Sequence, residues 1–428
     1  MTLNLLDSDE DLQTDSAEEY QALLNGLRRS QGFGLYFVQC SPFSGGKLIE
    51  RLQTALTDKK IAVLKFGKPI IDGNVFKRVQ TFLAEHNPVE ILIIQGLENS
   101  LFDAEETKKR LGWSDEKANA YTWREVPPVL INLNQQRERF RDSFPICFVF
   151  LLPQYAIKYL IHRAPDFFDW RSGLVNYASD ADTLAQESER IMEASDYDAY
   201  CTWSEDERKA RLFDIQTLID EPKTTTETCA ILYFEQGLLF ASTQDFSASV
   251  ICFDKATTLK PNFPNALYNK GIMLRKLGQN EAAIAAYDQA LAINSNDHEA
   301  LNNKGVALDD LGQYEAAIAA YDQALAIKPD KHEALYNKGI SLANLGQYEA
   351  AIAAYDQALA LKPDDPSPRY NKACCYGLQG NVENAIDYLQ KAIDLDPKYR
   401  TMAKTDTDFD PIRHDERFRA LVEGESLG

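Results

Sequence analysis

The sequence predicts two folds in one chain: an α/β domain with a parallel sheet, followed by an all-α superhelix. Residues 20–173 alternate apolar strands with amphipathic helices, and residues 230–399 repeat a two-helix pattern every 34 residues. The composition agrees with this division. Hydrophobic residues make up 45% of the 428 positions, which is enough for two or three folded domains.

The expected strands of the first domain are short, continuous apolar runs, and a helix follows each of them. Such strands are typical of a parallel sheet that helices cover on both faces. Ligands of these sheets bind beyond the carboxyl ends of the strands. The expected strands are 34–40, 61–66, 89–98 and 146–153, and the expected helices are 46–56, 74–86, 127–142 and one from 154 to near Pro165.

The segment "SPFSGGKL", residues 41–48, lies between the first strand and its helix. A phosphate-binding loop, G-x-x-x-x-G-K-[ST], cradles phosphate with backbone N–H groups, and its hydroxyl residue binds Mg²⁺. Gly46 and Lys47 match this pattern, whereas Ser41 replaces the first glycine and Leu48 replaces the hydroxyl residue. The candidate nucleotide-binding residues are Gly45, Gly46 and Lys47.

This layout resembles a P-loop NTPase domain of the STAND or AAA-like kind. The resemblance implies an acidic residue at the end of the third strand to hold Mg²⁺, but Gln95 stands there and Glu98 follows three residues later. Phosphoryl transfer without a held Mg²⁺ loses most of its electrostatic stabilisation. We therefore expect a degenerate domain with no catalytic residue, no metal and no cofactor. The alternatives left open are an active NTPase and ATP binding without turnover, whereas in a purely structural domain Gly45 and Gly46 only make the turn.

The second region consists of five repeats, numbered 1 to 5 in chain order. The string "GQYEAAIAAYDQALAI" recurs almost unchanged at intervals of 34 residues. A glycine or alanine in the eighth place lets the two helices approach closely, and a second glycine provides a left-handed C-cap in repeats 2 to 5. The repeats are 230–263, 264–297, 298–331, 332–365 and 366–399.

Each repeat resembles a tetratricopeptide repeat over its full 34 residues. The resemblance implies a first helix A and a second helix B, stacked into a superhelix whose concave face is lined by helix A. The segment 400–428 breaks the period and is expected to be a C-terminal capping helix. Repeat 1 is the most divergent, as expected for an end.

The sixth place of repeats 2 to 5 is always asparagine. A carboxamide offers a donor and an acceptor, and peptide-binding members of this family use asparagine at this place to hold an extended backbone. The other interpretation is that asparagine is only a consensus residue copied by duplication. With the neighbouring tyrosines, the predicted partner-binding residues are Tyr268, Asn269, Asn303, Tyr336, Asn337, Tyr370 and Asn371.

A lysine occupies the seventh place of the same repeats, at Lys270, Lys304, Lys338 and Lys372. Two interpretations are open: a row that holds a carboxylate-rich partner, or a solvated row. The segment "HRAPDFFDWRSG", 162–173, also has two interpretations. Its arginines contact a phosphate or a partner's acidic group, or its aromatic residues anchor a loop whose acidic and basic side chains pair.

The remaining segments complete the expected domain boundaries: an acidic disordered tail at 1–19 and a helical connector at 174–229, in which 222–228 is a loop. The net charge of −20 disfavours nucleic acid and anionic membranes as partners. We expect no signal peptide, no membrane insertion and reduced cysteines, which indicate a cytoplasmic protein. The amino-acid sequence of the repeats resembles that of arrays in cyanobacterial proteins, so we expect a bacterial source.

These features together predict a non-catalytic adaptor. Its repeats hold a protein or peptide, and its α/β domain docks a second protein or another copy of the chain. The alternative is a STAND-like signalling ATPase or nucleotide-binding switch that uses the repeats as a sensor.

Overall fold

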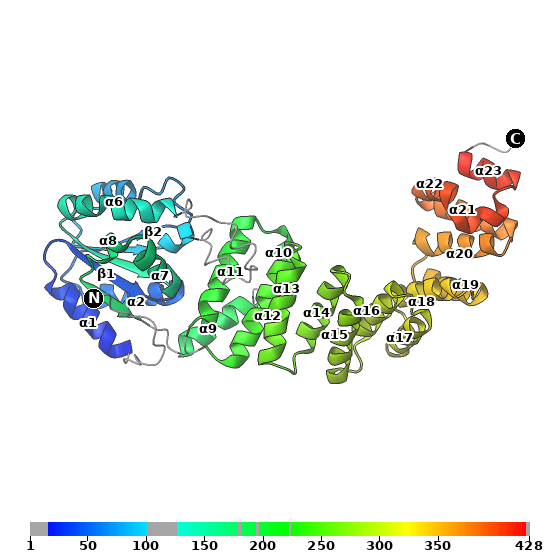
Figure 1. The fold of residues 1–428 in the computed structure, drawn as a ribbon, viewed down its shortest axis with the longest axis horizontal. Coiled ribbons are helices and arrows are strands. Elements are labelled where there is room, and N and C mark those ends of the chain that lie inside the picture. Colours follow the sequence, from blue (N-terminus) through cyan, green and yellow to red (C-terminus); the bar gives the residue numbers. More distant parts are fainter. Residues whose placement is uncertain (1–15, 102–125, 178–180, 194–196, 222–223, 425–428) are drawn as a thin grey trace. The chain divides into compact units, whose positions relative to one another are not determined.

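A computed structural model describes residues 16–101, 126–177, 181–193, 197–221 and 224–424. The predicted tail at 1–15 lies outside these residues. The chain forms two compact bodies, Met1–Lys260 and Pro261–Gly428 (Figure 1). We call them the N-terminal and C-terminal bodies.

The N-terminal body contains one five-stranded sheet in which all pairings are parallel, in the order β2-β3-β4-β1-β5. The parallel sheet is as predicted, but β5 is a fifth strand that the sequence did not reveal. It has only four residues and begins with glycine, so its apolar pattern is too short to recognise. The strands are β1 Gly34–Gln39, β2 Ile61–Lys65, β3 Ile91–Gln95, β4 Cys147–Leu152 and β5 Gly173–Asn176.

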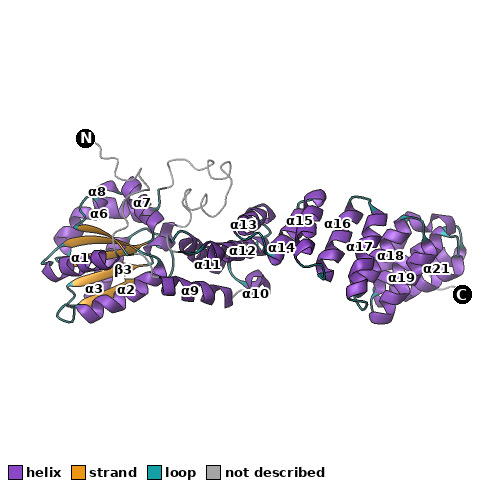
Figure 2. Cartoon of the chain, turned by 90° about the horizontal axis from the view of Figure 1, so that it is seen from below, coloured by secondary structure: helices purple, strands orange, loops and turns teal. Residues whose placement is uncertain are grey.

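Helices cover both faces of this sheet (Figure 2). Strand β4 shows why, because its side chains alternate between two cores: Phe148 and Phe150 lie in one, Val149 and Leu151 in the other. The helices around the sheet are α1 Ser16–Arg29, α2 Pro42–Ala55, α3 Val75–Glu85, η1 Leu97–Leu101, α6 Pro128–Ser143, α7 Gln154–Arg163 and α8 Pro165–Phe168. Since α1 begins at Ser16, residues 16–19 of the predicted tail are helical instead.

The segment 162–173 is anchored by its aromatic side chains. The ring of Phe168 lies 5.0 Å from that of Phe37 on β1, and Phe167 packs edge-on against Phe150. Asp166 pairs with Arg137 at 3.3 Å, and Arg171 lies 3.6 Å from Asp169. The structure therefore shows the aromatic anchoring and one ion pair within the segment, whereas Asp166 pairs with an arginine of α6 outside it.

Three helices follow the sheet: α9 Ala181–Glu193, α10 Tyr197–Thr202 and α11 Glu205–Ile219. Ser204 and Glu207 form a capping box at the start of α11, as its sequence suggested. Repeat 1 completes this body with α12 Thr226–Ser242 and α13 Phe246–Leu259. The loop predicted at 222–228 ends earlier, because Thr225 caps α12 through the backbone N–H of Thr228.

The C-terminal body contains repeats 2 to 5, each with its two predicted helices. Helices A are α14 Pro264–Lys276, α16 His298–Asp310, α18 His332–Asn344 and α20 Pro366–Leu378. Helices B are α15 Asn280–Ile293, α17 Tyr314–Ile327, α19 Tyr348–Leu361 and α21 Val382–Leu395.

The glycine in the eighth place is required by an aromatic ring on helix B. A Cβ at Gly271 would lie 2.5 Å from Tyr287 Cε1, closer than real Cβ contacts occur, and the same clash arises at Gly305 and Gly339 with their own tyrosines. Repeat 5 has Ala373 in this place and Leu389 where the tyrosine stands. The residue pair, not the glycine alone, sets the closeness of the two helices.

The end of the chain keeps the register of a sixth repeat, although its sequence breaks the period. It forms α22 Lys398–Thr405, η2 Thr407–Ile412 and α23 Glu416–Glu423. Helix B of a sixth repeat would begin at residue 416, where α23 does begin. Phe409 packs against Gly377 of α20, so a shortened repeat, rather than a single helix, covers the end of the array.

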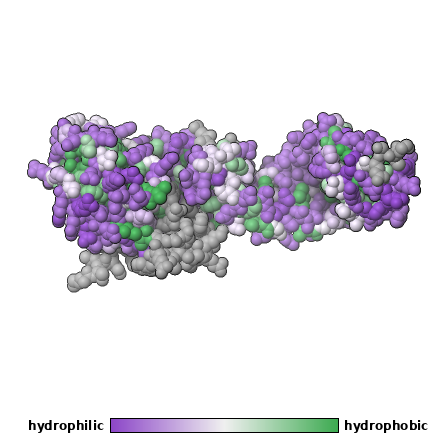
Figure 3. Space-filling view, turned by 90° about the horizontal axis from the view of Figure 1, so that it is seen from above, coloured by the Kyte–Doolittle hydropathy of each residue, from purple (hydrophilic) through white to green (hydrophobic). Residues whose placement is uncertain are grey.

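Exposed apolar residues recur at one place in repeats 2 to 5, and Ile251 and Leu277 are further exposed residues of the array. The last residue of each helix B is 38–45% exposed: Ile293, Ile327, Leu361 and Leu395. Figure 3 shows small, separate apolar patches on one face of the molecule. Single exposed aliphatic residues are normal on protein surfaces and do not mark a binding site.

Candidate functional site

The predicted asparagine row lies half-buried on the A helices, and its amide groups connect successive repeats. Asn303 Nδ2 donates to Tyr268 Oη at 2.8 Å, and Asn371 Nδ2 donates to Tyr336 Oη at 3.2 Å. Asn337 Nδ2 donates to Asn302 Oδ1 at 3.4 Å. Each bond joins the sixth place of one repeat to the fifth place of the repeat before it. The row is therefore an inter-repeat ladder, which the sequence analysis did not foresee.

Asn269 differs, because its Nδ2 donates to the backbone oxygen of Asn265 in its own helix, at 2.9 Å. Sequence reasoning treated the four asparagines as equivalent, but the structure gives them different partners.

Acidic side chains accept hydrogen bonds from tyrosines at two further places. In repeat 1 the sixth place is Glu235, which accepts from Tyr200 Oη of α10 at 3.0 Å. After repeat 5, Asp406 accepts from Tyr370 Oη at 2.6 Å. Burial, mainly, raises the pKa of Tyr268 in the inner part of the ladder to about 12, so this tyrosine keeps its proton at neutral pH.

The lysine row is paired within the array. Lys304 Nζ lies 2.6 Å from Asp288, Lys338 Nζ lies 2.5 Å from Asp322, and Lys372 pairs with Asp356. Each aspartate belongs to helix B of the preceding repeat, sixteen residues earlier, in the repeated string "AAYDQAL". Lys372 is therefore not solvated, whereas Lys304 and Lys338 remain partly exposed, and each of the three charges is paired with an aspartate.

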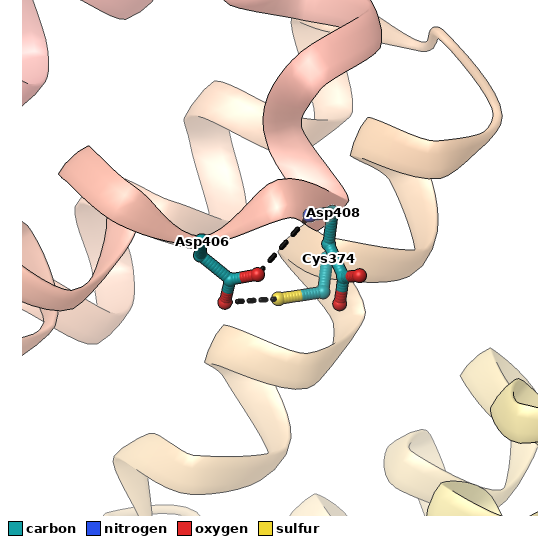
Figure 4. Close-up of side chains that lie close together, drawn as sticks. All are labelled: Cys374, Asp406 and Asp408. Carbon is teal, nitrogen blue, oxygen red and sulfur yellow. Dashed lines mark hydrogen bonds between the residues drawn. The ribbon is translucent and has the colours of Figure 1, made fainter.

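Cys374, Asp406 and Asp408 bring three candidate metal-binding atoms within 4.8 Å of one another (Figure 4). Asp406 accepts from Cys374 Sγ at 3.7 Å and from the backbone N–H of Asp408 at 3.1 Å, so it caps η2. Burial and the neighbouring carboxylates raise the pKa of the Cys374 thiol. A neutral thiol bonded to a capping carboxylate fits a structural role.

In the α/β domain, the chain between β1 and α2 contains only Cys40 and Ser41. Ser41 caps α2: its Oγ accepts from Ser44 N at 3.1 Å, and its backbone oxygen accepts from Gly45 N at 2.9 Å. Gly45 and Gly46 therefore lie inside the helix and do not form the turn expected from the sequence. The physical reason is that Pro42 fits the first position of a helix, so the helix begins before the glycines.

The surroundings of α2 fit packing rather than Mg²⁺ chemistry. Leu48 is completely buried in the core, and Lys47 Nζ lies 5.6 Å from the centre of the Phe43 ring. Gln95, which stands where an acidic residue would hold Mg²⁺, donates from Nε2 to Pro42 O at 3.0 Å. Glu98 is only 4% exposed, and burial raises its pKa to about 7.

Two small cavities lie beyond the carboxyl ends of the strands. One has a volume of about 150 Å³ and lies at the ends of β1, β4 and β5; the other has about 190 Å³ and lies beside Ser41 and Phe43. Helix α11 lines both of them, through Thr217. Pockets for small molecules usually measure roughly 300–1,000 Å³, so neither cavity has the size of a nucleotide site.

The comparisons with known proteins concern the array. The family model for the tetratricopeptide repeat matches residues 234–298, 268–332, 302–366 and 336–400. This part of the chain therefore consists of tetratricopeptide repeats. A search of curated proteins gave no match. Among the helices of the described residues, none combines the length and apolarity needed to span a bilayer.

Several solved structures are similar to the array. A MamA fragment from Desulfovibrio magneticus RS-1 is 22% identical, covers 40% of this chain and 96% of its own, and has a TM-score of 0.38. Another crystal structure of MamA is 23% identical over 39% of this chain and 96% of its own, with a TM-score of 0.37. YrrB, described as a tetratricopeptide repeat protein with an unusual peptide-binding site, is 25% identical over 41% of this chain and 91% of its own, with a TM-score of 0.37.

Proposed function

We propose that this chain is a non-catalytic adaptor whose tetratricopeptide repeats hold a protein or peptide partner along their A helices. The observation that carries the proposal is the fixed orientation of the asparagine row. The Nδ2 atoms of Asn303 and Asn337 are bonded within the ladder, whereas the described residues offer no donor to the Oδ1 of Asn303. The row thus presents acceptors at the spacing of the repeats.

An extended peptide backbone suits such a row. Its N–H groups are donors, and one acceptor from each repeat holds the backbone without reading its sequence. Side chains of Tyr268 and Tyr336 lie beside the row and add apolar contact area with little loss of conformational entropy. On this proposal the ladder has two roles, because the bonds that join the repeats also orient the acceptors.

The experiment separates these roles with a matched pair of variants. Asn303→Ala removes both the inter-repeat bond and the acceptor, whereas Tyr268→Phe removes the same bond and keeps the carboxamide. We expect captured partners to be lost with Asn303→Ala/Asn371→Ala and retained with Tyr268→Phe/Tyr336→Phe, because Tyr268 and Tyr336 accept from these two asparagines. Capture would be measured on immobilised protein, with helicity as the control. Equal recovery with both double variants would refute peptide binding by the row.

For the N-terminal α/β domain we propose docking of a second protein, or of another copy of this chain, in place of nucleotide turnover. The helical position of Gly45 and Gly46 and the bond between Gln95 and Pro42 argue against nucleotide turnover. The acidic net charge and the paired lysines favour partners other than nucleic acid. We propose the cytoplasm as the place where the adaptor works.

A nucleotide-binding switch is the second candidate, and one observation favours it: α2 begins directly after β1 at the carboxyl edge of a parallel sheet. Calorimetric titration with ATP and Mg²⁺ tests it. We expect no saturable heat up to millimolar ATP, because only two residues separate β1 from α2 and the cavities are small. Wild type and Lys47→Ala should behave alike. Tight binding that depends on Lys47 would instead establish the switch.

A further inference from the structure

The two edges of the parallel sheet differ in how they are covered. At one edge lies β5, which has only four residues, and there the Glu19 carboxylate of α1 accepts from the backbone N–H of Asn176. At the other edge lies β2, which has five residues and no described strand beyond it. Strand β2 is therefore the edge at which the sheet can be extended by another strand.

The hydrogen bonds of β2 show which of its backbone groups face outward. Lys60 O accepts from Ile91 N at 3.2 Å, and Phe66 N donates to Gln95 O at 2.8 Å, so alternate residues of this segment bond to β3. The residues between them direct their N–H and C=O groups away from β3: Ile61, Val63 and Lys65. The described residues offer these outward groups no hydrogen-bond partner.

The side chains of β2 are also less covered than those of the neighbouring strand. Val63 is half-buried, whereas Ile93, its register partner on β3, is completely buried. All four apolar residues of β2 are half-buried, although every residue of β3 is buried. The apolar side chains of an added strand would cover these exposed parts, and this burial would strengthen the main-chain bonds.

The charge along this edge is opposite to that of the chain as a whole. The segment 59–68, "KKIAVLKFGK", contains four lysines and no acidic residue, whereas the whole chain has a net charge of −20. Lys59 pairs with Glu90 at 3.1 Å. Three further lysines are exposed and form no salt bridge with a described residue: Lys60, Lys65 and Lys68.

These charges indicate the kind of strand that fits the edge. Side chains alternate along a strand, so Lys60 and Lys65 lie on opposite faces at the two ends of β2. Lysines at a sheet edge discourage pairing with apolar strands, whereas a carboxylate opposite each lysine stabilises the pairing. A second copy of β2 fits poorly, because in either direction the lysines at the strand ends would meet.

We propose that the free edge of β2 binds an extended acidic segment of a partner protein, which adds a sixth strand to the sheet. The main chain of this segment bonds to the outward groups of Ile61, Val63 and Lys65, and its carboxylates face Lys60 and Lys65. The inference specifies the surface and the partner of the docking role proposed above for the α/β domain, and it rests on that role.

Fluorescence anisotropy of labelled peptides added to the full chain tests the charge requirement. The acidic peptide SEVTVTES should bind about tenfold more tightly than SKVTVTKS, since two attractive cross-strand pairs replace two repulsive ones. Lys60→Glu/Lys65→Glu should reverse this preference. Lys328→Glu/Lys362→Glu, which makes the same charge change at exposed positions of the array, is the matched control and should keep it.

A second pair of variants tests the backbone requirement. Val63→Pro removes an outward N–H group and no bond to β3, so it should weaken binding of the acidic peptide by about tenfold. Val63→Thr keeps the N–H group and should bind like the wild type. Circular dichroism checks the fold of both variants. If Val63→Pro does not fold, the charge reversal decides the matter.

Equal affinity of the wild type for both peptides would overturn the proposal, as would a preference that survives Lys60→Glu/Lys65→Glu. A dimer in sedimentation equilibrium that Val63→Pro breaks would also overturn it, because the edge would then belong to a second copy.

The docking role itself is tested separately, with immobilised Asn303→Ala/Asn371→Ala chain as the bait. Partners captured equally with and without Val63→Pro would refute the β2 edge and leave the docking role standing. No captured partner at all would refute the docking role.

Discussion

The repeat array and the α/β domain both contain sequence patterns that suggest binding, but the structure uses these patterns differently. In the array, the asparagines and lysines of repeats 3 to 5 bond to side chains of the preceding repeat. In the α/β domain, a segment that resembles a phosphate-binding loop has become a capped helix packed onto the sheet. A repeated residue therefore obtains its bonding partner from the stacking of one repeat on the next. The binding function of a loop motif depends instead on the path of its backbone.

The largest loss of stability is expected when a glycine–tyrosine pair of the array is disrupted. Gly271→Ala places a methyl group against the ring of Tyr287, and overpacking of this kind costs about 3 kcal/mol of unfolding free energy. Urea unfolding followed by circular dichroism measures the loss.

A second substitution tests whether the clash with the tyrosine ring causes this loss of stability. Tyr287→Leu should restore much of the stability of Gly271→Ala, because the pair then matches Ala373 and Leu389 of repeat 5. Tyr287 is suitable because its hydroxyl has no hydrogen-bond partner among the described residues. A double variant no more stable than Gly271→Ala would show that the clash is not the reason for the glycine.

A smaller loss of unfolding free energy is expected when a lysine–aspartate pair of the array is broken. The loss should be larger where the lysine is more deeply buried. Lys372 is 1% exposed, so Asp356→Ala leaves its charge buried without a carboxylate and should cost about 2 kcal/mol. The Lys304 side chain is 27% exposed, and Asp288→Ala should cost only about 0.5 kcal/mol. Unfolding in urea of the two variants side by side checks the ratio. Equal losses would mean that burial does not control the strength of these pairs.

The smallest change in unfolding free energy is expected from a substitution in the α/β domain. Gly46 lies in α2, and a Cβ there would meet no atom within 4 Å. Gly46→Ala should therefore stabilise the chain by about 0.5–1 kcal/mol, as alanine does inside helices. Thermal unfolding measures the shift. A clear loss of stability would instead indicate that Gly46 needs the freedom of a loop.

The sequence analysis was most accurate where structure depends on local pattern. The helices of repeats 2 to 5 lie within the predicted bounds, because the 34-residue period fixes helix, turn and glycine cap together, whereas α12 of repeat 1 begins at Thr226, before its predicted bound at 230. The parallel sheet was predicted from continuous apolar strands, but β5 was too short to recognise. The segment after residue 399 lost the sequence period while keeping the fold of a sixth repeat, since packing on α20 tolerates different residues.

The candidate site was less accessible to prediction. The sequence identified the asparagines, but not that Tyr268 and Tyr336 would bond to them across 35 residues. It placed Gly45 and Gly46 in a turn because residue types in a motif do not specify where a helix begins. Helix α11 lines both cavities at this edge of the sheet through Thr217, beside Ser41, and no local pattern contains that information.

By itself, the sequence determined four of the five strands, the repeat helices, and that the second half of the chain is a tetratricopeptide array. Hydrophobic spacing and glycine caps act within a few residues, so they can be read directly. Only the tertiary structure decided which polar groups are bonded within the chain and which remain available to bind a partner. A buried donor, acceptor or charge must find its partner among residues brought close by stacking, and both the ladder and the lysine pairs are products of that stacking.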